Sequence, residues 1–144
     1  MKRRLLVLIL PIITLILEIL PYGAVCNFMR PPASTNPDAP VGHFRELYSY
    51  FDLTPFGYAN FAPLITAVIT CIILSLLILY CITGKHRLAI SARNILYVCT
   101  VFSLGPLVLG FRFFSVVGAL ITIALIGEIV LLYYLLPAHR EKTH

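Results

Sequence analysis

The sequence contains no tryptophan and few charged residues, because only 12% of its 144 residues are Asp, Glu, Lys or Arg. Soluble domains usually carry about 25% charged residues. By contrast, 60% of this chain is hydrophobic and its mean hydropathy is +0.95. So small a chain has too few polar residues to cover the surface of a compact fold in water. The composition therefore excludes a water-soluble domain and indicates an integral membrane protein in a lipid bilayer.

Several motifs that carry chemistry are also missing from the sequence. The four cysteines form no C-x-x-C pair and three lie inside apolar runs, which argues against a disulfide framework or a zinc site. There is no metal-ligand cluster, nucleophile–base pair or phosphate-binding glycine loop, so we expect neither an enzyme nor a cofactor. The net charge of +5 comes from basic residues at the edges of apolar runs, so nucleic acid is not an expected partner.

Four apolar runs are each long enough to cross the bilayer as a helix, which takes about 20 residues. They cover residues 5–24, 61–83, 88–110 and 113–136. Each run must be helical, because lipid cannot satisfy exposed backbone donors and acceptors. The short connections between the last three runs favour antiparallel neighbours. The sequence therefore predicts an all-α membrane protein, a single domain that forms an up-down bundle of four transmembrane helices.

The lysines and arginines predict the direction of this bundle. Cytoplasmic segments of membrane proteins are enriched in these residues. One side would carry eight of the eleven: Lys2, Arg3, Arg4, Lys85, Arg87, Arg93, Arg140 and Lys142. The other side would carry Arg30, Arg45 and Arg112. We therefore expect a plasma-membrane protein with both termini in the cytoplasm and a large extracellular loop over residues 25–60.

A basic start followed by an apolar run is also typical of a signal peptide. The context for cleavage is poor, because bulky Tyr22 stands where a small residue is preferred and Val25 precedes Cys26. Glu18 is also unusual inside a signal sequence. We therefore expect the first run to remain as an uncleaved helix.

The extracellular loop divides into two parts of different composition. Through residue 40 it carries four prolines among small polar residues and reads as irregular chain. Residues 41–58 are rich in aromatic side chains. There Leu47, Ser49 and Phe51 alternate as in a strand, whereas Phe44, Leu47 and Phe51 also fit one face of a short helix. The sequence leaves strand, helix and irregular structure open, and it predicts that this segment caps the bundle at the outer membrane surface.

A few residues predict where the helices end, bend and pack. Asn60 and Pro63 suit the start of the second helix, and Gly84 suits its end. Gly105 and Pro106 are expected to kink the third helix. In lipid, close contact between helices depends on small residues. Two sets of small residues follow helical spacing: Ala67, Cys71 and Ser75 in the second run, and Ser115, Gly118 and Thr122 in the last.

An ionisable side chain inside the membrane is a functional hypothesis, because lipid makes its charge costly. Glu18 lies in the outer part of the first run, where Thr14, Glu18 and Tyr22 share one helical face. Arg112 lies at the outer edge, between the last two runs. We expect an ion pair between Glu18 and Arg112 that joins the first helix to the last two. The alternative is a protonatable carboxylate at Glu18 in a cavity of the bundle.

A second intramembrane carboxylate, Glu128, lies in the inner part of the last run, and Arg93 lies near the start of the third. Because these two runs are hairpin neighbours, a pair of Arg93 and Glu128 would keep both charges in the membrane. None of the candidate residues is predicted to be catalytic or to bind a metal. The candidate polar sites are Thr14, Glu18, Tyr22, Arg93, Arg112 and Glu128.

Two segments carry a family resemblance: EILPYGAV at residues 18–25 and YSYFDLTPFGYANF at residues 48–61. They resemble small four-span membrane proteins of Gram-positive bacteria, a family with no known activity, and the likeness extends over the whole chain. The resemblance implies a bacterial plasma membrane. It also suggests that Glu18 and the aromatic loop belong to one shared feature at the outer surface.

A looser likeness concerns small multidrug-resistance exporters, which also have four helices and a carboxylate in the first helix, where Glu18 would match. Those exporters have short connections and a tryptophan in the third helix, whereas this chain has a long loop and no tryptophan. Disulfide-forming quinone reductases also have four helices, but they need paired external cysteines, and only Cys26 is external here. Neither likeness therefore indicates an activity for this chain.

Two functions fit these residues. The first is a non-catalytic structural or accessory subunit whose aromatic loop contacts a partner. The second is a small proton-coupled transporter or exporter that uses Glu18. A transporter would have to be a homo-oligomer, because four helices enclose little space. The expected partners are the lipid bilayer and either another membrane protein or further copies of this chain.

Overall fold

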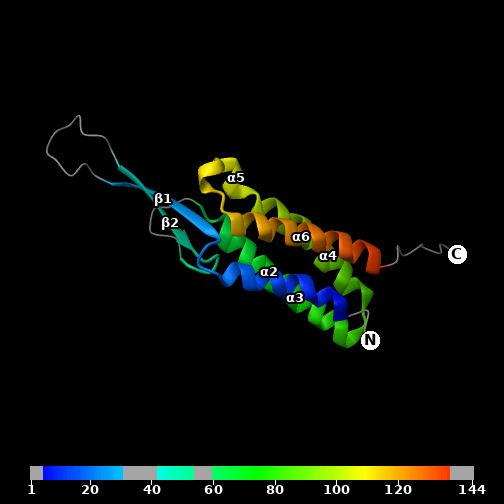
Figure 1. Ribbon diagram of the computed structural model, residues 1–144. Coiled ribbons are helices and arrows are strands. Elements are labelled where there is room, and N and C mark those ends of the chain that lie inside the picture. The colour runs from blue at the N-terminus through cyan, green and yellow to red at the C-terminus, as the bar shows by residue number, and fades with distance from the viewer. Residues whose placement is uncertain (1–4, 31–41, 54–59, 137–144) are drawn as a thin grey trace, which may run out of the picture.

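The computed structural model describes residues 5–30, 42–53 and 60–136. Within these residues the helices form an elongated bundle, and a two-stranded hairpin projects from one end of it (Figure 1). The fold is mostly helical, as predicted, but it also contains a small sheet that an all-α fold would lack. In chain order the elements are the 3-10 helix η1 (Leu6–Leu8), α2 (Ile9–Ile19), β1 (Ala24–Arg30), β2 (Gly42–Tyr48), α3 (Ala62–Thr83), α4 (His86–Ser103), α5 (Gly105–Leu109), the 3-10 helix η2 (Phe111–Phe113) and α6 (Val116–Leu135).

Three helical segments are long and apolar enough to cross a membrane, namely Ala62–Thr83, His86–Leu109 and Val116–Leu135. The first apolar helix, Leu6–Ile19, is shorter than these and shorter than its predicted range of 5–24. It ends where Leu20 becomes extended, with ψ 136°. Pro21 follows, and the residue before a proline avoids the helical conformation. Residues 20–24 of the predicted run therefore lie outside the helix.

Local signals explain the two ends of α3. Pro63 lies in the first turn, where a missing backbone donor costs nothing. Gly84 has φ 70° and its N–H donates to Tyr80 O at 2.8 Å, which confirms the predicted end of the helix. The predicted cap at Asn60 is wrong, because Phe61 occupies the N-cap position. Asn60 is buried, and its Oδ1 has no hydrogen-bond partner among the described residues.

The third predicted run, 88–110, is two helices rather than one. Helix α4 ends at Ser103 and α5 begins at Gly105, so the break falls at the predicted kink. Pro106 lies in the first turn of α5 and cannot donate the hydrogen bond that a continuous helix requires. The last run, predicted from residue 113, begins later, because η2 and the N-cap residue Ser115 precede Val116.

The hairpin consists of β1 and β2, which pair antiparallel from Ala24 opposite Tyr48 to Arg30 opposite Gly42. The prediction of irregular chain was therefore wrong for residues 26–30. For the aromatic part, the strand alternative is confirmed as far as Tyr48, after which residues 49–51 turn back to the bundle. Outside the described residues lie the four prolines of the loop and the basic residues near the ends of the chain: Pro31, Pro32, Pro37, Pro40, Lys2, Arg3, Arg4, Arg140 and Lys142.

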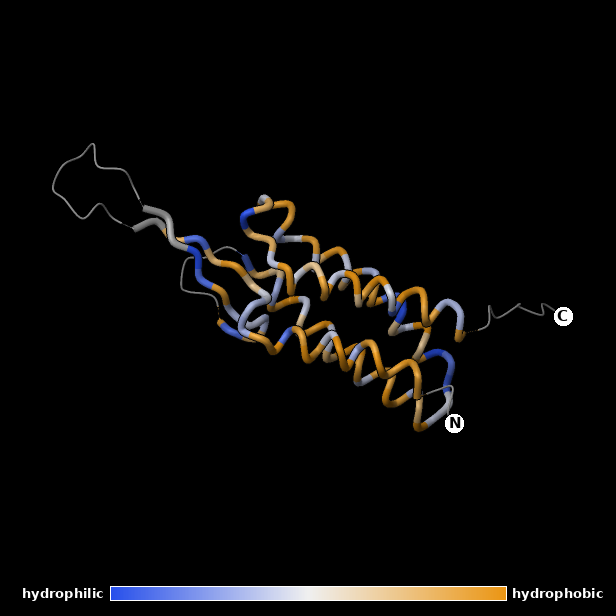
Figure 2. Tube along the Cα trace, viewed as in Figure 1, coloured by the Kyte–Doolittle hydropathy of each residue, from blue (hydrophilic) through white to orange (hydrophobic). Residues whose placement is uncertain are grey.

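Small side chains let the helices approach one another. Ala67 of α3 and both Ala89 and Ala92 of α4 are fully buried, and these two helices are neighbours. Helix α2 packs against α3 and α6, and α4 packs against α6. The helices are largely apolar along their length (Figure 2), and many of their large hydrophobic side chains are exposed. The bundle thus buries one apolar face of each helix inside and leaves other apolar side chains exposed.

Candidate functional site

Glu18 and Glu128 both lie in the interior of the bundle. Glu18 is 0% exposed near the end of α2, and Glu128 is 1% exposed in α6. The buried face of α2 consists of Pro11, Thr14 and Glu18. Tyr22, predicted on the same face, is 55% exposed because the helix ends before it. The polar face that the sequence predicts therefore holds for Thr14 and Glu18 alone.

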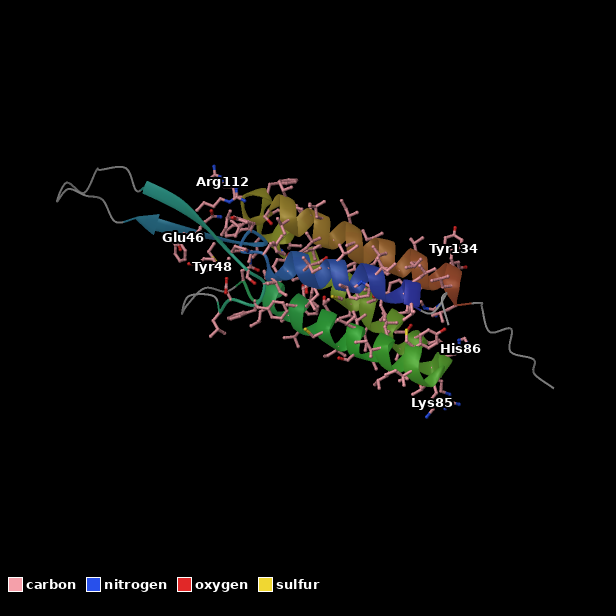
Figure 3. The ribbon with its side chains drawn as sticks, turned by 60° about the horizontal axis from the view of Figure 1, so that its bottom comes forward. Glu46, Tyr48, Lys85, His86, Arg112 and Tyr134 are labelled. Carbon is pink, nitrogen blue, oxygen red and sulfur yellow. The ribbon has the colours of Figure 1, made fainter. Side chains whose placement is uncertain are left out.

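Glu18 is bound by a threonine rather than by an arginine. Its Oε1 accepts a hydrogen bond from Thr70 Oγ1 of α3 at 2.8 Å. Its Oε2 has no hydrogen-bond partner among the described residues. Arg112 is exposed in η2, at the hairpin end of the molecule (Figure 3). The ion pair predicted between Glu18 and Arg112 is therefore not formed, because Arg112 lies outside the helical interior that encloses the carboxyl group.

Thr70 joins three helices at this point. Its hydroxyl lies 2.8 Å from Glu18 Oε1 and 3.0 Å from Thr66 O, so its single proton is shared between two acceptors. Cys99 Sγ of α4 lies 3.7 Å from Thr70 Oγ1 and 3.7 Å from Thr66 O. Thr70 was not among the predicted site residues. Only the spacing of Thr66 and Thr70, one turn apart in an apolar run, pointed to a polar contact in the sequence.

Glu128 faces the interior near the middle of α6. Neither of its carboxyl oxygens has a hydrogen-bond partner among the described residues. Arg93 is half-buried, and its Nε also has no partner there. The predicted pair of Arg93 and Glu128 is therefore not formed. Arg93 lies beside the inward face of α4, which consists of Ala89, Ala92, Leu96, Cys99 and Ser103.

The two glutamates lie on the buried faces of α2 and α6, which pack against each other. Cys99 lies on the inward face of α4, which also packs against α6. In the part of the chain that the structure describes, no three His, Cys, Asp or Glu side chains are grouped so that they could hold a metal ion. The interior thus contains a pair of carboxyl groups on α2 and α6, bordered by a hydroxyl and a thiol.

Residues 49–52, which we call the cap segment, close the end of the bundle that carries the hairpin. Tyr50 N and Ser49 Oγ each donate to Glu18 O at 2.9 Å. Tyr50 is 1% exposed, and burial raises the pKa of its phenol, an effect to which the nearby charge of Glu18 adds. A cap over the bundle was predicted from the sequence, but the insertion of Tyr50 into it was not.

Ser115 joins the first and last helices at the same end. Its Oγ donates to Gly23 O at 2.6 Å and accepts from Gly118 N at 2.8 Å, which caps the start of α6. Ser115, Gly118 and Thr122 are all buried, as their spacing predicted. Thr122 continues this polar contact inward, since its Oγ1 lies 3.1 Å from Ser103 Oγ of α4.

The middle of the hairpin is attached to the turn before α6, through the facing residues Asn27 and Arg45. Asn27 Nδ2 of β1 donates to Arg112 O, and Arg45 Nη2 of β2 donates to Phe114 O, both at 3.4 Å. Ala24, at the start of β1, is buried in the core of the bundle. The hairpin is therefore held against the bundle by side-chain hydrogen bonds as well as by its covalent connections to the helices.

The two ends of the molecule differ in the charged and aromatic groups that they present. In the hairpin, the Tyr48 phenol donates to Glu46, and this hydrogen bond raises the pKa of Tyr48 to about 12. Figure 3 shows Glu46, Tyr48 and Arg112 at the hairpin end, and Lys85, His86 and Tyr134 at the opposite end.

A shallow apolar groove of about 370 Å³ lies on the outer face of α3. Of the small residues predicted to pack in this helix, Ala67 is buried, whereas Cys71 and Ser75 face this groove. Neither Glu18 nor Glu128 lines it. The groove is lined by Phe51, Val68, Cys71, Ile72, Ser75 and Leu76.

Comparison of the chain with protein-family models, curated proteins and solved structures found no match. The functional assignment therefore rests on the geometry of the buried carboxyl groups, the cap segment and the hairpin.

Proposed function

We propose that the chain crosses the plasma membrane four times, with both termini in the cytoplasm and the hairpin outside. The shorter helix Leu6–Ile19 packs among the three longer ones, which supports a fourth crossing (Figure 1). The hairpin lies at one end of the bundle, and Lys85 lies at the other (Figure 3). The excess of Lys and Arg that the sequence assigns to the second end supports a cytoplasmic location for it.

Labelling of intact cells with a membrane-impermeant maleimide tests this orientation. The variants Glu46→Cys and Lys85→Cys place one thiol at each end of the molecule, in a chain whose four native cysteines are replaced. Both positions are exposed in the structure, so they form a matched pair. Glu46→Cys should react in intact cells, and Lys85→Cys only after permeabilisation. Reaction of Lys85→Cys in intact cells would contradict the orientation.

For this membrane protein we propose a non-catalytic accessory role, in which the hairpin binds a partner membrane protein. One observation carries the proposal: the hairpin projects beyond the end of the bundle (Figure 1). Among the described strands β2 pairs with β1 alone, so β2 presents its other edge to a further chain. Arg45, Glu46 and Leu47 are exposed along it, and Leu47 is a hydrophobic side chain that is 42% exposed.

The attachment of the hairpin supports this role as well. A two-stranded hairpin by itself is marginally stable in water. Here the hydrogen bonds from Asn27 and Arg45 attach the middle of the hairpin to the turn before α6. A surface that is held in place loses less conformational entropy on binding than a mobile loop does. The hairpin is therefore suited to act as a preformed contact surface.

Site-specific photocrosslinking in the native membrane tests the accessory role. A photoreactive amino acid in place of Leu47 should give a single protein adduct, and the same protein should co-purify stoichiometrically with the uncrosslinked chain. The same amino acid at Tyr134, which is also exposed but lies at the opposite end, is the matched control. Identical adducts from both positions, or none from Leu47, would contradict binding through the hairpin.

A second candidate function is proton-coupled transport by a homo-oligomer that uses Glu18. The observation that favours it is the buried Oε2 of Glu18, which has no hydrogen-bond partner among the described residues. Purified protein in lipid vesicles should then move protons, and Glu18→Gln should abolish the flux. Glu46→Gln, an exposed glutamate of the hairpin, should leave it unchanged. Absence of flux in the wild-type protein would remove this candidate.

A further inference from the structure

Three polar side chains on the facing helices α2 and α6 have buried oxygen atoms with no hydrogen-bond partner among the described residues: Thr14 Oγ1, Glu18 Oε2 and both carboxyl oxygens of Glu128. The register of these helices follows from Leu10 of α2, whose Cδ1 lies 3.6 Å from the position of a Cβ on Gly127. Thr14 lies one turn beyond Leu10, and Glu18 lies one turn beyond Thr14. Glu128 directly follows Gly127. Thr14 is therefore placed between the levels of the two carboxyl groups.

The hydroxyl of Thr14 differs from the other buried and half-buried hydroxyls of the bundle. Serine and threonine inside helices commonly donate to the carbonyl oxygen four residues earlier. Thr14 does not make this bond, and its Oγ1 has no other partner in the described part of the chain, although the side chain is 0% exposed. Its hydroxyl is therefore free to donate and to accept. Six hydroxyls make the bond: those of Thr66, Thr70, Ser75, Thr83, Thr100 and Thr122.

Among the described residues, no lysine or arginine forms a hydrogen bond with either carboxyl group. Thr70 of α3 gives Glu18 one hydrogen bond from a neutral hydroxyl. The titratable groups within electrostatic range are Cys71 of α3, Cys99 of α4 and Tyr50 of the cap segment, and each of these is neutral or negative. Arg93 lies beside the inward face of α4 and makes no ion pair with either glutamate. Burying an ionised carboxylate without a partner is costly, so this interior accommodates the neutral acid best.

We propose that Thr14, Glu18, Thr70 and Glu128 form a proton-binding site inside the bundle, in which the two carboxyl groups titrate as a coupled pair. The ligand is a proton, which binds to a carboxylate oxygen, and no bond of the protein breaks. The hydroxyl of Thr14 lies between the levels of the two acids, and a hydroxyl can both accept and donate a hydrogen bond. This site goes beyond the accessory role, and it supplies the group that transport would need. Because binding is measured without flux, the site and the transport function can fail separately.

Infrared titration of the full chain in lipid bilayers tests the site. Protonated and ionised carboxyl groups absorb at different frequencies, so the bound proton is observed directly and no reagent has to enter the bundle. The wild-type protein should show a band of protonated carboxylic acid at neutral pH. Glu18→Gln and Glu128→Gln should each reduce this band by about half, because each removes one of two acids. Glu46→Gln is the control and should leave the band unchanged.

Coupling between the two acids gives a second readout. Each Gln variant should move the titration midpoint of the remaining carboxyl by about one pH unit, which is the scale of interaction between coupled sites. Thr14→Val keeps the shape of the side chain and should also move the midpoint, so the site stays testable if a Gln variant fails to fold. An absent band in the wild-type protein, or midpoints that no variant moves, would overturn the site. Loss of the band on adding Na⁺ at constant pH would assign the site to a cation instead and overturn the proton assignment.

Discussion

Tyr50 lies directly against Gly23, so closely that a Cβ on the glycine would come within 2.8 Å of the ring atoms Cδ1 and Cε1. The Tyr50 hydroxyl also lies 3.3 Å from the position that a Cβ on Gly118 would take. Gly23 follows the first helix and Gly118 lies in the first turn of the last. The ring of Tyr50 can close the hairpin end of the bundle because neither glycine has a side chain there.

Replacement of Gly23 with alanine should destabilise the protein by about 1–3 kcal/mol, because an added methyl group overfills a packed site. Thermal unfolding of the purified protein in detergent measures this change. Gly127→Ala is the matched control, since its Cβ would meet Leu10 at 3.6 Å, an ordinary contact distance. Equal melting temperatures for the two variants would contradict the close fit of Tyr50 on Gly23.

Ser115→Ala should cost about 0.5–2 kcal/mol, the usual range for loss of an N-terminal cap. The variant removes the hydrogen bonds to Gly23 O and from Gly118 N together. Amide hydrogen exchange should accelerate in the first turn of α6. Ser75→Ala is the comparison, because Ser75 is exposed and bonds only to Cys71 O in its own helix. Unchanged exchange at Gly118 in Ser115→Ala would show that the cap does not hold this turn.

Thr70→Val should destabilise the protein by about 1–3 kcal/mol, because it leaves the buried carboxyl of Glu18 without its only hydrogen bond from the described residues. Thr66→Val removes a hydroxyl that bonds to Ala62 O within the same helix, so its effect should be smaller. Both variants are compared by chemical or thermal unfolding in the same detergent. If Thr66→Val proves the more damaging, the bond between Thr70 and Glu18 does not carry the stability assigned to it.

Tyr48 should titrate with a pKa of about 12, against an ordinary value of 10.0, because its phenol donates to Glu46. The folded-state pKa is the higher one, so the contact stabilises the hairpin below about pH 10 and its effect is lost as the pH rises toward 12. The difference in phenolate absorbance between the wild-type protein and Tyr48→Phe isolates this titration. Glu46→Gln should bring the midpoint back toward the ordinary value. A midpoint near 10 in the wild-type protein would show that the bond to Glu46 is absent in solution.

Features that depend on neighbours along the chain could be predicted from the sequence. The three long helices follow from unbroken apolar runs, and the end of α3 follows from Gly84, which takes the left-handed conformation. The break before Pro106 follows from its missing backbone donor. The end of the first helix at Ile19 was missed, although Pro21 stood in the sequence as its cause. Residues 20–24 are also largely apolar, so the hydropathy of the run predicted a helix that extends past the proline.

Features that depend on the return of a distant segment could not be predicted. The partners proposed for Glu18 and Glu128 were chosen by opposite charge, as the sequence offers no measure of which helix faces turn inward. In the structure the inward face of α4 passes beside Arg93, and Thr70 reaches Glu18 from α3. The pairing of β1 with β2 also lay beyond the sequence, because the strand pattern of residues 47–53 fitted a helix as well.

The backbone carbonyl of Glu18 receives hydrogen bonds from both Ser49 and Tyr50, at the point where the hairpin strand returns to the bundle. The hairpin is therefore joined through Ser49 and Tyr50 to the helix that holds the buried carboxyl group of Glu18. A force on the hairpin would therefore act on the last turn of α2. Through the hydrogen bond from Ser115 to Gly23 O it would also act on α6. Such a force would thereby reach the two helices that hold the acids.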